Sequence, residues 1–152
     1  ATVITEQISV IDPENLEYYS RRLDKFILSI QQLYIDGFSR SRIIADKPFL
    51  TLHPGWAYFS DAFQLNAVGS FYSGGSQATP KYLRELGALI DLHDVRVIFT
   101  EPQLSASAVN AVVEDRDLII GVLDPLGGSG DKTSYQLLID ANINALIKHL
   151  GD

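Results

Sequence analysis

The stretch Leu52-His53-Pro54-Gly55-Trp56-Ala57-Tyr58-Phe59 contains the transition that decides the fold of this chain. The apolar run from Pro48 to Leu52 predicts a short buried strand, and the proline and glycine that follow end it. The aromatic segment from Trp56 to Phe63 then predicts a short helix. His53 is thereby placed where a strand gives way to a helix. Ligands of open α/β sheets bind outside the carboxyl ends of the strands, so this histidine is the first candidate for a functional residue.

Three more strand and helix pairs follow this transition. We expect strands at residues 67–72, 95–99 and 118–123, and helices at residues 79–93, 105–113 and 134–150. Strands that alternate with helices predict a parallel sheet covered by helices on both faces. The predicted fold class is therefore α/β, with a four-stranded, mostly parallel sheet.

The N-terminal residues follow a helical pattern instead. Asp12-Pro13-Glu14 predicts a helix start, with Asp12 as the capping acceptor. Apolar residues then recur at spacings of three and four up to Leu33, which predicts one long helix. Gly37 is interpreted as the end of this helix and residues 39–47 as a polar connector, whereas residues 1–11 carry only weak structural signals. We expect an N-terminal segment with the long helix at residues 1–38 and an α/β lobe at residues 39–152, within one structural domain overall.

Composition narrows the possible functions. A length of 152 residues suits one domain, and a net charge of -7 argues against a nucleic-acid surface, which needs a basic patch. The absence of cysteine excludes disulfides, thiol catalysis and zinc ribbons within this sequence. No apolar run approaches the roughly 20 residues that span a bilayer. Because the sequence contains no methionine, we expect that a leader was removed from it or that it is a piece of a longer chain.

Two carboxylates are predicted to share the sheet edge with His53. Asp124 follows the fourth predicted strand and Glu101 follows the third. Imidazole and carboxylate groups together are suitable ligands for zinc, and Glu101 could instead orient the histidine from behind. Each residue also has a purely structural interpretation: a histidine packed at a turn, an Asp-Pro turn, and a glutamate paired with a backbone amide or a lysine.

The remaining polar features favour structural roles. His93 and His149 fall near predicted helix ends, where a positive charge is favourable, so we interpret both as structural or exposed. The loop from Gly127 to Thr133 does not match a phosphate-binding loop, because Asp131 stands where a glycine must precede the lysine. No nucleophile with an adjacent base is recognisable, and we expect that the protein is not an enzyme. An enzyme with Asp124, Glu101 and Gly127-Gly128 at its active edge is the alternative.

Five motifs occur in an order and spacing that resemble a known family. They are Ile11-Asp12-Pro13-Glu14-Asn15-Leu16-Glu17-Tyr18-Tyr19, His53-Pro54-Gly55-Trp56-Ala57-Tyr58-Phe59, Phe99-Thr100-Glu101-Pro102-Gln103-Leu104, Leu123-Asp124-Pro125-Leu126-Gly127 and Lys132-Thr133-Ser134-Tyr135. Together they resemble the C-terminal half of the zinc- and manganese-binding solute-binding proteins of ABC transporters. The resemblance covers nearly the whole chain.

The resemblance implies two α/β lobes, joined by one long helix, with the metal held between them. His53 matches the histidine that the C-terminal lobe supplies, and Asp124 matches an aspartate that ligates the metal in many members. A histidine rather than a glutamate at position 53 favours Zn²⁺ over Mn²⁺. The histidines of the N-terminal lobe are not in this sequence, so we expect the chain alone to hold zinc weakly.

The resemblance also implies partners and a location. The partners would be an ABC permease, together with an N-terminal lobe or a second copy of the chain. The location would be periplasmic or otherwise extracytoplasmic. The alternative function is a protein-interaction, adhesin-like or self-associating α/β module with no tight metal site, because a missing lobe would leave apolar surface to be covered.

Overall fold

The computed structural model, which describes residues 1–71, 79–104, 110–128 and 130–151, has a four-stranded sheet flanked by helices. Its strands are β1 (Phe49–Thr51), β2 (Ala67–Ser70), β3 (Val97–Thr100) and β4 (Ile119–Val122), and their order in the sheet is β2-β1-β3-β4. All three pairings are parallel. The predicted α/β class is confirmed, although the strands are shorter than predicted.

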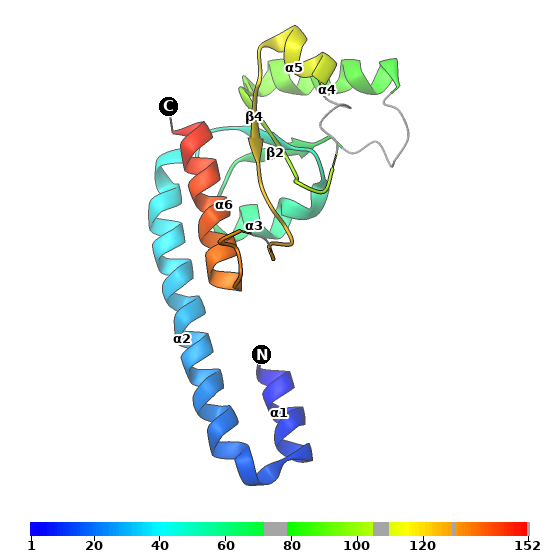
Figure 1. Ribbon diagram of the computed structural model, residues 1–152. Coiled ribbons are helices and arrows are strands. Elements are labelled where there is room, and N and C mark those ends of the chain that lie inside the picture. The colour runs from blue at the N-terminus through cyan, green and yellow to red at the C-terminus, as the bar shows by residue number, and fades with distance from the viewer. Residues whose placement is uncertain (72–78, 105–109, 129, 152) are drawn as a thin grey trace. The chain divides into compact units, whose positions relative to one another are not determined.

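The sheet separates two apolar cores, because successive side chains of a strand point to opposite faces. Phe49 and Phe99 belong to one core, and Leu50 and Ile98 belong to the other. The first core is closed mainly by α6 (Tyr135–Leu150) and by residues at the ends of α3 (Ala57–Ala62). The second is closed by α4 (Pro80–His93) and α5 (Asn110–Arg116). Figure 1 shows α6 beside β4, with α4 and α5 in another part of the lobe. Both faces of the sheet are therefore covered, as the alternating pattern predicts.

Side-chain caps set the starts of two helices. The Thr79 hydroxyl accepts a hydrogen bond from the Tyr82 amide at the start of α4, and the Ser134 hydroxyl accepts one from the Leu137 amide at the start of α6. Both helices start and end within a residue or so of their predicted bounds. The predicted cap at Ser105 and the loop at residues 73–76 lie outside the described residues.

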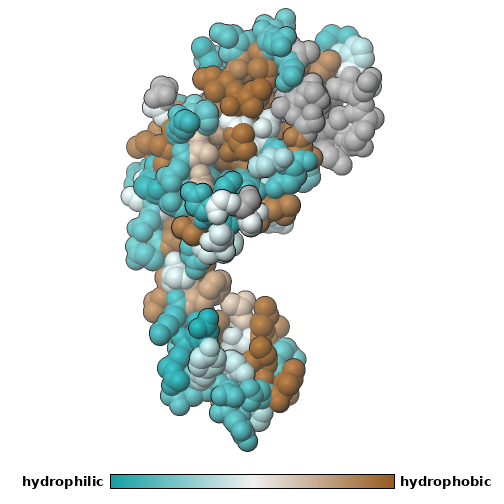
Figure 2. Space-filling view, in the orientation of Figure 1, coloured by the Kyte–Doolittle hydropathy of each residue, from teal (hydrophilic) through white to brown (hydrophobic). Residues whose placement is uncertain are grey.

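The chain divides into two compact units, Ala1–Asp36 and Gly37–Asp152. The first contains α1 (Thr2–Ile11), the short 3-10 helix η1 (Pro13–Asn15) and the beginning of α2 (Leu16–Ser41). Figure 2 shows apolar side chains gathered on the surface of α1. The second unit contains the sheet, both cores and all the predicted site residues. No helix in the described part of the chain combines the length and apolar content that crossing a membrane requires.

Three details of the N-terminal prediction are wrong, and a helix lies where the sequence predicts no element. Residues 2–11 form a helix despite their weak signals, and the Asp12 side chain does not cap a helix amide. Helix α2 continues through Gly37 to Ser41, and residues 42–44 then form a 3-10 helix in which Ile44 is fully buried. Gly37 does not end the helix. Its lack of a side chain admits close neighbours, because a Cβ atom there would lie 2.5 Å from Cδ1 of Ile143.

Candidate metal site

The three predicted site residues follow three strands of the sheet on its carboxyl edge. His53 lies two residues beyond β1, Glu101 directly follows β3, and Asp124 lies two residues beyond β4. Strand β3 lies between β1 and β4, so Glu101 falls between the other two. Neighbouring strands are roughly 4.8 Å apart, and the strands carrying His53 and Asp124 are therefore separated by about 10 Å. The structure thus gathers all three on one edge, as the sequence predicts.

The backbone around His53 fixes the orientation of its ring. The Thr51 hydroxyl donates a hydrogen bond to the His53 carbonyl oxygen at 2.8 Å, and the Gly55 amide donates one to Nδ1 of His53 at 3.2 Å. Nδ1 also lies 3.8 Å from Oε1 of Glu101, which is too long for a hydrogen bond. The ring therefore turns Nδ1 toward the protein, while 45% of the side chain is open to solvent.

Glu101 is a buried carboxylate held by the only tryptophan of the sequence. Its Oε1 accepts a hydrogen bond from Nε1 of Trp56 at 2.9 Å, and 7% of Glu101 is exposed. The carboxylate lies beside Nδ1 of His53 without a hydrogen bond to it, and a carboxylate so placed orients an imidazole by accepting a hydrogen bond from a ring N–H. The geometry is compatible with the predicted orienting role of Glu101, which stays a prediction.

Asp124 is the most tightly held of the three. Its Oδ1 accepts hydrogen bonds from Nε2 of Gln103 (3.2 Å) and from the amides of Leu126 (3.1 Å) and Gly127 (3.0 Å). Its Oδ2 accepts one from Nζ of Lys132 at 2.8 Å. The Lys132 ammonium, and after it these other donors, hold the pKa of the buried Asp124 carboxyl well below its usual range, against the opposing effect of burial. Asp124 is therefore an anion throughout the neutral range.

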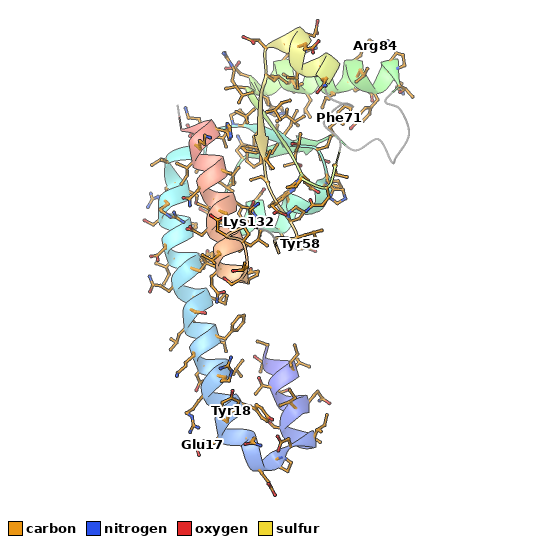
Figure 3. All side chains as sticks on the ribbon, in the orientation of Figure 1. Glu17, Tyr18, Tyr58, Phe71, Arg84 and Lys132 are labelled. Atoms are coloured by element: carbon orange, nitrogen blue, oxygen red, sulfur yellow. The ribbon has the colours of Figure 1, made fainter. Side chains whose placement is uncertain are left out.

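Three partners of Asp124 have no role in the sequence-based predictions. Asn142 of α6 donates to the backbone oxygen of Asp124 and accepts from its amide, both at 2.8 Å, and is itself buried. Asn142 interrupts the apolar inner face of α6, and this interruption is the signal that could have revealed it. Gln103 and Lys132 lie within quoted motifs, but nothing in their spacing pairs them with Asp124. Figure 3 shows Lys132 in the loop before α6.

The alternative interpretation of Asp124, an Asp-Pro turn in which the carboxylate bonds its own backbone, is also correct. The carboxylate accepts hydrogen bonds from the amides two and three residues further along.

Two other histidines stand apart from the site: His93 and His149 lie in the last turns of α4 and α6, and the ring of His149 packs edge-on against Phe99. Within the described ranges, no group of three or more His, Cys, Asp or Glu side chains is arranged to hold a metal ion.

Comparisons with known proteins agree with this architecture. Residues 1–149 match the protein family described as "Zinc-uptake complex component A periplasmic". The chain is 26% identical over 144 residues to the high-affinity zinc uptake system protein ZnuA of Haemophilus ducreyi, and the match covers 93% of this chain and 46% of that protein. It is 28% identical over 163 residues to the manganese-binding lipoprotein MntA of Bacillus subtilis, covering 97% of this chain and 52% of the relative.

A solved structure supports the fold. The crystal structure of a ZnuA superposes with a TM-score of 0.84 at 20% identity, and the match covers 98% of this chain and 54% of that one. The chain thus spans about half the length of the relatives that it matches.

Proposed function

We propose that this chain, which belongs to the family of the periplasmic zinc-uptake complex component A, contributes one half of a zinc site in the solute-binding component of an ABC uptake system. The role is non-catalytic: the protein captures Zn²⁺ and presents it to a permease. The observation that carries the proposal is the gathering of His53, Glu101 and Asp124 on one edge of the sheet.

The donor types support zinc as the ion. His53 offers a neutral nitrogen from a half-exposed ring, and Asp124 offers a carboxylate oxygen. Nitrogen and oxygen donors of this kind suit Zn²⁺, whereas sites made mainly of oxygens suit Mn²⁺ better. One relative of this chain is named as manganese-binding, and Mn²⁺ is the second choice.

The number of donors predicts weak binding by this chain alone. Zinc sites in proteins have four ligands, of which at least three usually come from the protein. His53 and Asp124 supply two of these ligands, and the proposed role of Glu101 is to orient the imidazole of His53 and not to bind the metal. We infer that the remaining ligands come from a second lobe or a second copy of the chain, and that the complete site works outside the cytoplasm beside an ABC permease.

Zinc titration of the 152-residue chain tests this proposal. Calorimetry measures the affinity, and the fluorescence of Trp56 reports on the site, because its indole is bonded to Glu101. We expect at best micromolar binding that His53→Ala removes. The matched control is His93→Ala, which removes an exposed histidine at the end of α4 and leaves binding unchanged. Nanomolar affinity that survives His53→Ala would refute the half-site.

A second candidate function is a self-associating or adhesin-like module without a tight metal site. The outer strand β4 supports it, because Ile119, Ile120 and Val122 are 50%, 37% and 48% exposed. Contiguous exposed apolar residues mark many interaction surfaces. Sedimentation with and without zinc separates the two functions: a dimer that forms in chelator favours the interaction module, whereas a monomer in both conditions, or a dimer that forms only with zinc, favours the half-site.

A further inference from the structure

We propose that the ammonium group of Lys132 is a built-in competitor for the incoming metal. It is bonded to Oδ2 of Asp124, the carboxylate oxygen with fewer donors in the described part of the chain, and zinc reaches that oxygen only by displacing it. The inference rests on the proposed zinc-binding function and identifies a residue that sets its affinity.

The two oxygens of Asp124 have different partners. Among the described residues, Oδ1 receives three hydrogen bonds, from the Gln103 side chain and from the amides of Leu126 and Gly127, and Oδ2 receives one, from Lys132. Three donors leave little access to Oδ1, because a carboxylate oxygen has about two lone-pair directions. A metal ion that uses Asp124 would therefore bind Oδ2, where the ammonium now lies.

Lys132 is able to leave without dismantling the loop. Its side chain is 29% exposed, whereas that of Asp124 is 3% exposed, so the lysine can turn out into solvent, and its departure would uncover the carboxylate. The backbone of the loop is fixed independently, because the Gly128 amide donates to the Lys132 carbonyl oxygen at 2.9 Å. Asn142 also fixes the backbone of Asp124 through two hydrogen bonds. Only the four-carbon stem of the lysine has to move.

The exchange has a consequence for affinity. A buried carboxylate without a partner is costly, and Lys132 compensates its charge when no metal is bound. Zinc binding must therefore include the loss of the Asp124–Lys132 ion pair, and the net affinity is lower than that of the same carboxylate with no lysine. A site that passes its ion to a permease needs an affinity limited in this way, since the ion must also be released.

The decisive variant is Lys132→Met, which removes the charge but keeps a long, flexible apolar stem. We expect it to bind zinc about tenfold more tightly than the unsubstituted chain in calorimetry, because a charge-assisted hydrogen bond no longer has to be broken. The matched control is Lys148→Met. It removes the same charge from an exposed lysine of α6 that has no ion pair within the described part of the chain, and should change the affinity less than twofold.

A second measurement needs no variant. In the 15N-labelled chain, the side-chain ammonium of Lys132 should exchange slowly with water while it is bonded to Asp124. Zinc should make this exchange fast, and the amides of Leu126 and Gly127 should stay protected. This result would decide the question even if Lys132→Met failed to fold.

The outcomes separate this inference from the function on which it rests. Zinc binding that Lys132→Met leaves unchanged or weakens, or a Lys132 ammonium that zinc does not release, would overturn the competitor role while leaving the zinc site standing. Absence of zinc binding in both the unsubstituted chain and Lys132→Met would overturn the proposed function itself. Binding that is detectable only in Lys132→Met would support the competitor role.

Discussion

The two compact units of the chain differ in what stabilises them. In Gly37–Asp152, two cores lie on the two faces of one sheet. In Ala1–Asp36, no residue is buried, and large apolar side chains are exposed on both helices. The most exposed of these are Val3, Ile4, Val10, Ile11, Leu28 and Ile35. An apolar stripe at helical spacing therefore predicts a helix, but it does not predict how much of the apolar surface of that helix is buried.

The comparison predicts that truncating a buried apolar side chain of the second unit lowers the free energy of unfolding strongly, whereas truncating an exposed one of the first unit hardly changes it. Ile143→Ala removes a fully buried side chain from the core beneath α6, and we expect a loss of about 3 kcal/mol in the free energy of unfolding. Leu28→Ala, at a position 64% exposed on α2, should change it by less than about 0.5 kcal/mol. Urea denaturation measures both. An equal loss for Leu28→Ala would mean that this helix is covered in solution.

The second prediction compares two asparagines of α6. Asn142→Ala leaves the buried amide and carbonyl of Asp124 without their partners, so we expect a loss of about 2 kcal/mol in unfolding free energy. Asn144 lies on the exposed side of the same helix, where it bonds Arg40 and Asp140, and Asn144→Ala should cost less than about 0.5 kcal/mol. If the two variants unfolded at the same urea concentration, Asn142 would not be the clamp that the geometry indicates.

The same division explains what the sequence predicts well. Alternating β-branched strands and capped helices are local patterns, and they place all four strands and the helices α4 and α6 close to where they lie. The carboxyl-edge position of His53, Glu101 and Asp124 follows from the parallel sheet alone. These features depend on periodicity and chain direction, which a single sequence contains.

The features that the sequence does not predict depend on contacts between distant residues. The pairing of Asn142 with Asp124 joins residues 18 positions apart in the sequence, and the hydrogen bond between Trp56 and Glu101 joins residues 45 positions apart. The sequence predicts a helix end at Gly37. The structure instead shows a close contact there with the side chain of Ile143, more than a hundred residues away. Such pairs are fixed by tertiary packing, for which no local spacing rule exists.

Gly37 gives a third prediction, at the first residue of the second unit. Gly37→Ala should gain up to about 1 kcal/mol of helix propensity. It should lose more than that, because the new Cβ would lie 2.5 Å from Cδ1 of Ile143 and 2.8 Å from Cε1 of Phe63. We expect a net loss of about 1 kcal/mol in unfolding free energy. Ile143→Val removes Cδ1, so the double variant should be more stable than the sum of the single losses implies. Strict additivity would place the clash elsewhere.

The smallest predicted effect belongs to the first unit, where one carboxylate joins the start of α2 to the turn before it. Asp12 accepts a hydrogen bond from the Tyr19 hydroxyl at 2.6 Å and two from the Asn15 side chain. The Tyr19 hydroxyl, and after it Asn15, lower the pKa of the Asp12 carboxyl. The pKa is lower in the folded unit than in the unfolded chain, so this contribution is complete above a pH of about 4 and is lost as pH falls through the folded value.

Titration of the Asp12 carboxyl carbon by NMR tests this assignment directly. Tyr19→Phe deletes the hydroxyl and should raise the pKa of Asp12 toward its ordinary value. Tyr18→Phe deletes the neighbouring hydroxyl, which makes no bond to Asp12, and should leave that pKa unchanged. An unchanged Asp12 pKa in Tyr19→Phe would show that the turn does not hold this hydrogen bond in solution. Because Asp12 lies in a unit without buried residues, solvent screens the interaction, and acid should loosen this turn while leaving the two cores of the second unit folded.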